Sequence, residues 1–486
     1  MAFVTGPLPQ RLKIIHGFGA VAFGVKDSGF SFFLLLYYSQ VLGMDAGTVS
    51  LALLLALLFD AVIDPILGNL SDRTYSRWGR RLPWLYSAPI PLAIAWVLLW
   101  SPPTSGVPSF GELLTIAIVV RVLLSACEVP SVSLVPEMTA DYDDRTTLFR
   151  YRFLSGWIGG LVMMVLAYLV FMPGPDGLLQ PEGYASFGIF GAVLIVISVI
   201  GSAAGQHHII ARLPREKPPP FSVRVAFQEI IQAFSERSFL IFAAGGLAAY
   251  VSQGMTFSIT NYLNLFVWKL KQTELVFYPI TLFFSVILMF VLVGPMHRRY
   301  GKPKSAVIGA LASVVLLAIP YVLLLAGLWP EPGTLPSTVG FFAFLLIANT
   351  LGVVMMISAT SMIAEIVEAF EERTHRRAEG AFYSGNWLVQ KCATGFGIFV
   401  TGQIISLSQL APGIQPGEVE PEVIRSMVIY YIAFSFVLAG IAAYWLGNFP
   451  ISREEHEERV ATLEKRRKQA LDAAARGDID AGTIVP

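Results

Sequence analysis

Residues 51–84 read LALLLALLFDAVIDPILGNLSDRTYSRWGRRLPW, an apolar run that carries two aspartates and ends in a basic segment. A helix that crosses a bilayer needs about 20 mostly apolar residues. The apolar part of this stretch is long enough, and the arginines from Arg73 to Arg81 are typical of the cytoplasmic end of such a helix. The segment therefore predicts a transmembrane helix with acidic groups inside it and a basic loop after it.

The composition of the whole chain supports a membrane protein. Its 486 residues are 55% hydrophobic and only 14% charged, and the mean hydropathy is +0.63, whereas soluble domains carry about 25% charged residues. Basic and acidic residues balance at 34 each, which argues against a nucleic-acid partner. The two cysteines, Cys127 and Cys392, lie in apolar runs and indicate no disulfide framework. These numbers argue against a water-soluble enzyme.

Hydropathy predicts about twelve membrane-spanning helices. Their centres lie near Phe30, Leu58, Ile94, Val120, Val162, Leu194, Leu247, Ile287, Leu316, Met355, Ile398 and Phe434. We expect the first to be a true span, because no small-residue cleavage site follows it at the spacing of a signal peptide.

Basic residues occur in every second loop. The loops at 73–81, 145, 212–224, 297–304 and 373–377 are rich in arginine and lysine, whereas those near Asp45, Pro102, Pro173, Gly333 and Pro416 hold almost none. Lys269, Lys271 and Arg425 are the exceptions. Because basic loops stay in the cytoplasm, both termini are predicted to be cytoplasmic, which requires an even number of spans.

The polar stretch 207–236 contains three consecutive prolines and predicts a cytoplasmic linker. It separates an N-terminal half at 1–206 from a C-terminal half at 237–449, and a charged tail follows at 450–486, for which we expect a solvated amphipathic helix. The turn Gly79-Arg80-Arg81 and the turn Gly301-Lys302-Pro303 form a weak repeat between the halves. The predicted fold is an all-α membrane protein with 12 transmembrane helices in two six-helix halves, an architecture of secondary transporters.

Several spans carry charged residues, which are costly inside a bilayer and often mark an ion or substrate path. Asp60 and Asp64 are spaced i, i+4, so both carboxylates lie on one face of the second helix. They repel unless a cation lies between them, and such a pair suits Na⁺ or H⁺. Arg121, Ser125 and Glu128 share a face of the fourth helix. We predict that Asp60, Asp64, Ser125 and Glu128 bind the cation, with Asp60 and Asp64 as the metal ligands if it is sodium.

The charges in the spans leave one acid in excess. The acids are Asp27, Asp60, Asp64 and Glu128, and the bases are Lys26, Arg121 and Lys391, so the balance is 4 − 3 = 1 negative charge. A bound Na⁺ or H⁺ would neutralise it. Simpler alternatives stay open: Lys26 as an interfacial lysine, Arg121 as a partner that only neutralises an acid, and Lys391 as a packing contact.

Residues 60–68, 71–73 and 77–84 resemble the second-span signature of glycoside–pentoside–hexuronide:cation symporters, which belong to the major facilitator superfamily. Lys26-Asp27 followed by Tyr37-Tyr38 resembles the first span of that family, and Glu128-Val129-Pro130 resembles its fourth. The stretch from Glu365 to Lys391 resembles its tenth-to-eleventh region.

The resemblance implies a role for each matching residue. Asp60 and Asp64 match the cation ligands, and Ser125 matches a threonine that assists them. The polar residues that contact sugar or couple it to the ion are matched by Lys26, Asp27, Glu128, Arg152 and Lys391. For coupling and gating we expect Arg121 and the loop residues Arg73, Arg80 and Arg81, with the loop locking one state against Glu365 and Glu368.

The sequence also departs from the family pattern. Ile63 stands where the melibiose carriers have an asparagine, so sodium ligation loses an oxygen. Val132 and Met356 stand where those carriers have tryptophans, which removes a stacking platform for sugar and suits a more apolar ligand. Arg121 has no counterpart in the resemblance.

We therefore expect a Na⁺- or H⁺-coupled symporter of a glycoside or similar small solute that works by alternating access without a cofactor. The alternative is a cation-dependent carrier of lysophospholipid or another amphiphile. A related animal branch of the family is similar to such a carrier, one that depends on sodium and moves lysophospholipid. An intramembrane enzyme is disfavoured, because an aspartyl dyad normally comes from two facing elements, and a receptor or scaffold is the remaining class. The expected state is a monomer in a prokaryotic inner membrane, with no partner besides the solute and the lipid bilayer.

Overall fold

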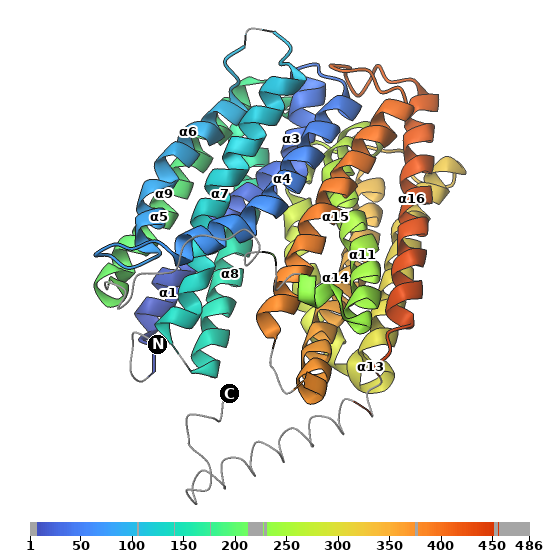
Figure 1. Cartoon of the computed structure of the whole chain (residues 1–486). Helices are drawn as coiled ribbons and strands as arrows, with labels where there is room; N and C mark the ends of the chain where they lie inside the picture. The colour runs from blue at the N-terminus through green and yellow to red at the C-terminus, as the bar shows by residue number, and fades with distance from the viewer. Residues whose placement is uncertain are drawn as a thin grey trace, which may run out of the picture.

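The computed structural model describes residues 7–104, 106–139, 141–174, 176–211, 227, 231–374, 378–451 and 455. Within these ranges the regular structure is helical, with no strand (Figure 1). This confirms the prediction of an all-helical protein. The predicted linker at 207–236 and the tail at 450–486 lie mostly outside the described residues.

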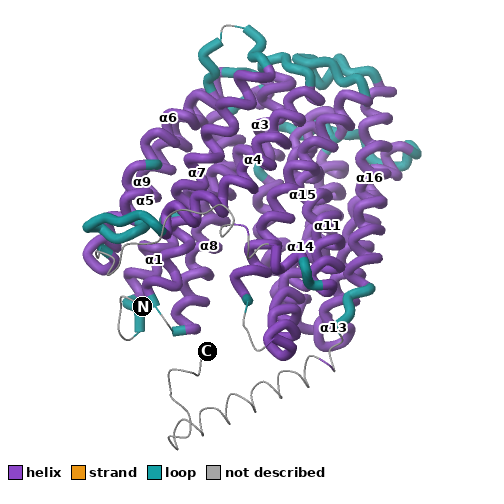
Figure 2. Tube along the Cα trace, in the orientation of Figure 1, coloured by secondary structure: helices purple, strands orange, loops and turns teal. Residues whose placement is uncertain are grey.

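The helices form two bundles, which lie side by side in Figure 1. The N-terminal bundle contains α1 (Gln10–Phe18), α2 (Val21–Ser28), α3 (Leu34–Leu36), α4 (Ala46–Asp72), α5 (Leu82–Ser87), α6 (Pro89–Trp100), α7 (Phe110–Met138), α8 (Tyr142–Leu166) and α9 (Glu182–Ile210). The C-terminal bundle contains α11 (Arg237–Tyr262), α12 (Gln272–Leu275), α13 (Phe277–Leu325), α14 (Leu335–Thr374), α15 (Glu379–Leu407) and α16 (Pro421–Gly447). Loops and turns gather at the two ends of the bundles (Figure 2).

Short stretches of wider helix lie within the span Gln10–Val41 and at the ends of the spans Asp143–Phe171 and Arg237–Val267. These π-helical turns are η1 (Gly29–Phe33), η2 (Tyr37–Val41), η3 (Ala167–Phe171) and η5 (Leu263–Val267), and a 3₁₀ turn, η4, covers Gly177–Leu179. π-Helical turns are rare in proteins, and many of those that occur lie at functional sites.

Ten of the described helices are long and apolar enough to cross a membrane. The predicted centres all lie inside helical segments, but two of these segments differ from a simple span. Ile94 lies in α6, an apolar helix of only 12 residues, and α13 contains both Ile287 and Leu316 within 49 residues. Inside α13, Gly301 has φ 74° and ψ 170°, a left-handed conformation that favours glycine and breaks the helix.

Side-chain caps fix where the long helices of the N-terminal bundle begin. Asp45 accepts a hydrogen bond from the Thr48 amide at 2.8 Å and starts α4. Ser109 and Asp141 cap α7 and α8 in the same way. Pro65 lies inside α4, and Pro130 and Pro136 lie inside α7, where each removes a backbone donor near the acidic residues.

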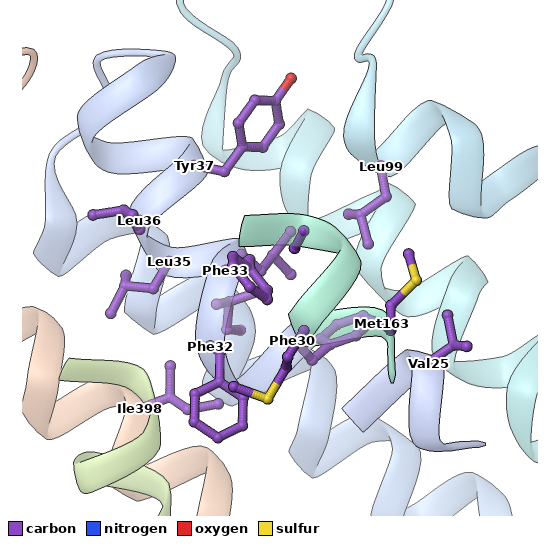
Figure 3. Packing of buried hydrophobic residues seen from close by; sticks show 14 of the residues in the cluster. Val25, Phe30, Phe32, Phe33, Leu35, Leu36, Tyr37, Leu99, Met163 and Ile398 are labelled. Atoms are coloured by element: carbon purple, nitrogen blue, oxygen red, sulfur yellow. The ribbon is translucent and has the colours of Figure 1, made fainter. Parts of the chain in front are cut away.

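Apolar packing joins the two bundles toward their upper end in Figure 1. Phe32 of η1 and Ile398 of α15 belong to one buried apolar cluster, part of which Figure 3 shows, and the Phe32 ring centroid is 4.8 Å from that of Phe257 in α11. Hydrogen bonds also link the bundles there: Ser39 to Tyr262 at 2.5 Å and Tyr168 to Asn261 at 2.8 Å. The bundles are therefore held together at the end that lies away from the basic loops.

Candidate functional site

Asp60 lies at the centre of a buried charge cluster, halfway along α4. Its side chain is only 2% exposed. Its Oδ1 accepts a hydrogen bond from Ser125 Oγ of α7 at 2.7 Å, and its Oδ2 lies 2.9 Å from Lys391 Nζ of α15. Asp64, one turn further along α4, also pairs with the Lys391 ammonium. The two carboxylates thus share one face, and a lysine of the other bundle lies between them.

Arg121 of α7 contacts the same carboxylate. Its NH1 lies 3.6 Å from Asp60 Oδ2, and its guanidinium lies over the Phe30 ring, 4.3 Å from the centroid. Asp60 is therefore paired with two cations, one from each bundle. Asp64 is less enclosed, because its side chain is 24% exposed and its Oδ1 has no hydrogen-bond partner among the described residues.

A second group of charges surrounds Lys26 of α2. Its ammonium lies 2.9 Å from Asp27 and 3.6 Å from Glu128 of α7. The Lys26 side chain is 9% exposed, whereas Asp27 is 68% and Glu128 is 32% exposed. The two carboxylates are thus accessible and able to accept hydrogen bonds from a polar solute.

Arg152 of α8 completes this second group. It donates a hydrogen bond to Ser131 Oγ at 2.6 Å, lies over the Phe23 ring, and attracts Glu128 electrostatically. Counting Arg152 corrects the charge balance expected from the sequence. The acids Asp27, Asp60, Asp64 and Glu128 now face four bases, Lys26, Arg121, Arg152 and Lys391, so the balance is 4 − 4 = 0.

The basic loop after α4 is held within its own bundle. Arg81 pairs with Asp72 and with Glu137, the latter at 2.9 Å, and donates to Ser71 Oγ at 2.6 Å. Arg73 and Arg80 lie on the same loop and are half-buried.

On the other bundle, Glu365 of α14 pairs with Lys302 at 2.8 Å, and Glu368 lies one turn away. In this conformation Arg81 and Glu365 thus have ion-pair partners in their own bundles. The predicted lock between the basic loop and Glu365 or Glu368 stays a prediction.

Sequence reasoning did not find several of these partners. Ser131, Glu137 and Lys302 contact predicted site residues, yet each is separated from its partner by more than one helix turn, so helical spacing gives no signal for them. Asn261 and Tyr262 of α11 are both fully buried in contacts between the bundles, where Asn261 also donates to the Phe32 carbonyl at 2.8 Å.

Comparison with known proteins places the chain in a family. The family model described as MFS/sugar transport protein matches residues 15–453. An uncharacterised symporter of Synechocystis is 27% identical, over 94% of this chain and 97% of that protein. A glucuronide carrier protein homolog of Escherichia coli is 26% identical, over 95% and 97% of the two chains. The isoprimeverose transporter of Lactiplantibacillus pentosus is 24% identical, over 95% and 93%.

Solved structures share the fold. A crystal structure of the nucleoside transporter NupG superposes with a TM-score of 0.60 at 14% identity, over 91% of this chain and 99% of that one. The family model, the relatives and the shared fold are all those of transporters, so the chain is a transporter and not an enzyme. The chain therefore belongs to the MFS/sugar transport family, among the glycoside–pentoside–hexuronide:cation symporters, as a multi-pass protein of the bacterial inner membrane.

Proposed function

We propose that this protein is a secondary active symporter that couples a cation to the transport of a glycoside or similar small hydrophilic solute by alternating access. The position of Lys391 between Asp60 and Asp64 carries this proposal. Because Lys391 belongs to α15 and the aspartates to α4, the acid pair is part of the contact between the bundles. A cation that neutralises the pair competes with Lys391 and so changes how strongly the bundles hold together.

We propose twelve spans with both termini in the cytoplasm. A straight helix of the 49 residues of α13 would be about 74 Å long, more than twice the roughly 30 Å core of a bilayer, so its break at Gly301 divides two spans. α5 and α6 together supply the third span. The proposed domains are 1–206, 207–236 as the linker, 237–449 and 450–486 as the tail.

We infer that this structure is the inward-facing conformation. Packing and hydrogen bonds close the end away from the basic loops, at Phe32, Ser39 and Tyr168. Asp27 and Glu128 are nevertheless exposed in the middle of their spans. Solute then reaches Lys26, Asp27, Glu128, Arg152 and Lys391 from the cytoplasmic side, and transport requires the outer contacts to open.

The names of the relatives favour a sugar-like solute over an amphiphile. The glucuronide carrier homolog and the isoprimeverose transporter are named for sugar derivatives. Two accessible carboxylates, Asp27 and Glu128, with Lys26 and Arg152 beside them, offer acceptors and donors for the hydroxyls of such a molecule. The protein is expected to act as a monomer.

A ligand screen by thermal unfolding tests the solute class. The purified chain is heated with α- and β-glycosides, pentosides, hexuronides or lysophospholipids, each with and without Na⁺ and at two pH values. A ligand at about 100 times its dissociation constant stabilises by about 2.7 kcal/mol. We expect stabilisation by a glycoside that depends on one cation. Stabilisation by lysophospholipids alone would contradict the proposal and favour the amphiphile carrier.

Charge reversal tests the proposed lock at the cytoplasmic end. Arg80→Glu and Glu365→Arg, each alone, are expected to reduce transport about fivefold or more, because each places like charges together in the outward-facing state. The double variant is expected to restore transport, measured as uptake into proteoliposomes. As a matched control, Lys302→Glu combined with Glu365→Arg rebuilds the pair seen in this conformation. Failure of the Arg80–Glu365 exchange to rescue either single loss would exclude this lock.

A further inference from the structure

Arg121 is the cation at the acid pair that stays in place when the bundles move. It lies on α7, which packs against α4 within the N-terminal bundle, so its contact with Asp60 does not cross between the bundles. Its side chain is 7% exposed and is held between Asp60 and the Phe30 ring. A guanidinium remains charged at all physiological pH values. The pair Arg121–Asp60 therefore lies within one bundle and does not depend on contact with the other.

Lys391 differs from Arg121 in this respect. It belongs to the C-terminal bundle and its side chain, a flexible chain of four carbons, is 21% exposed. Because Lys391 lies on α15, it moves with that helix. A motion that separates α15 from α4 removes the ammonium and leaves Arg121 behind. The site then carries Asp60, Asp64 and Arg121, and Asp64 is the carboxylate without a fixed basic partner.

The oxygens of Asp60 do not suit a metal ion. Hard metal cations take several oxygen ligands, whereas Asp60 Oδ1 already accepts from Ser125 and its Oδ2 faces Arg121. Ile63, on the turn between the two aspartates, supplies no side-chain oxygen. No group of three or more histidine, cysteine or acidic side chains able to hold a metal occurs in the described part of the chain. A metal ion next to Asp60 would also lie close to the guanidinium, which repels it.

We propose that Arg121 is a specificity-determining residue that supplies to Asp60 the positive charge a sodium ion would bring, and thereby excludes Na⁺ and Li⁺ from the acid pair. This inference rests on the proposed function, and it removes Na⁺ and Li⁺ from the possible coupling ions. It predicts that sodium neither stabilises the protein nor drives transport.

Sodium titration of the purified full chain tests the exclusion without any solute. NaCl or LiCl is added against choline chloride at constant ionic strength, and binding is followed by thermal unfolding and calorimetry. The wild type is expected to show no saturable response. Arg121→Met, which frees Asp60, is expected to gain saturable binding of Na⁺ at least about tenfold tighter than any wild-type binding.

Arg145→Met is the matched control. Arg145 is an arginine of the same bundle that donates to the Thr139 carbonyl at 2.9 Å, and its loss should leave the protein insensitive to sodium. Saturable stabilisation of the wild type by Na⁺ would overturn the proposal. A folded Arg121→Met variant that gains no saturable Na⁺ binding would overturn it too. If that variant does not fold, the wild-type titration alone decides.

Uptake experiments separate this inference from the proposed function. Proteoliposomes are given a sodium gradient, a proton gradient or neither. Accumulation that is driven by a proton gradient and does not depend on sodium supports both symport and the exclusion of sodium. Accumulation driven by a sodium gradient supports symport and overturns the exclusion. Absence of accumulation with either gradient overturns symport, and the binding titration still decides the exclusion.

Discussion

Asp60→Asn is expected to abolish gradient-driven accumulation of solute and to lower the stability of the protein. Asp60 is the shared partner of Arg121 and Lys391, and its side chain is 2% exposed. Neutralising it leaves a buried guanidinium without its ion pair, and breaking such a pair costs about 3–5 kcal/mol. It also removes one carboxylate of the acid pair at the proposed cation site. Uptake into proteoliposomes and chemical unfolding measure the two effects.

A double variant separates the role of Asp60 in coupling from its role in stability. Asp60→Asn combined with Arg121→Met removes the unpaired guanidinium, so stability is expected to recover substantially while accumulation stays absent. Asp176→Asn, at an exposed position in the loop that precedes α9, is the control and should behave as the wild type. Full gradient-driven accumulation by Asp60→Asn would show that the cation site has been assigned wrongly.

Gly402→Val is expected to prevent closure of the outer end and to stop transport while leaving the bundles folded. A Cβ atom at Gly402 of α15 would lie 2.0 Å from Ser50 Oγ and 2.5 Å from the Ala46 carbonyl oxygen of α4. The Ser50 hydroxyl can rotate, but the carbonyl is backbone and cannot move without shifting α4. Overpacking of about 1–3 kcal/mol would shift the equilibrium toward the outward-open state by about 5–150-fold.

Spin labels report this shift directly. Val107→Cys and Glu418→Cys place one label on an exposed loop of each bundle, before α7 and before α16, in a chain whose Cys127 and Cys392 are replaced by alanine. We expect the distance distribution to lengthen in Gly402→Val. Gly440→Val is the matched control, because a Cβ there meets no atom within 4 Å. An unchanged distribution together with normal uptake would refute the idea that the Gly402 contact closes the outer end.

Local sequence patterns predicted the helices because a membrane span depends mainly on one contiguous stretch. The apolar run that contains Leu58 becomes α4, and Asp45 caps it through a contact only three residues away. The same local rule placed Asp60 and Asp64 on one face, since helical periodicity alone fixes their relation. Helical periodicity did not predict the contact between Lys26 and Asp27. Neighbouring side chains point about 100° apart on a helix, yet the long lysine stem reaches the adjacent carboxylate at 2.9 Å.

The sequence by itself determined the helical segments, the alternation of basic loops and the charged residues within the apolar stretches. Only the tertiary structure decided which charges meet. Lys391 is 331 residues from Asp60, and Arg152 is 21 residues from Ser131, so no helical period relates them. The packing of α15 against α4 brings the first pair together, and the packing within the N-terminal bundle holds Arg121 against Asp60. Because electrostatic energy depends on distance in space and on burial, the charge balance of the site became definite only when the bundles were assembled.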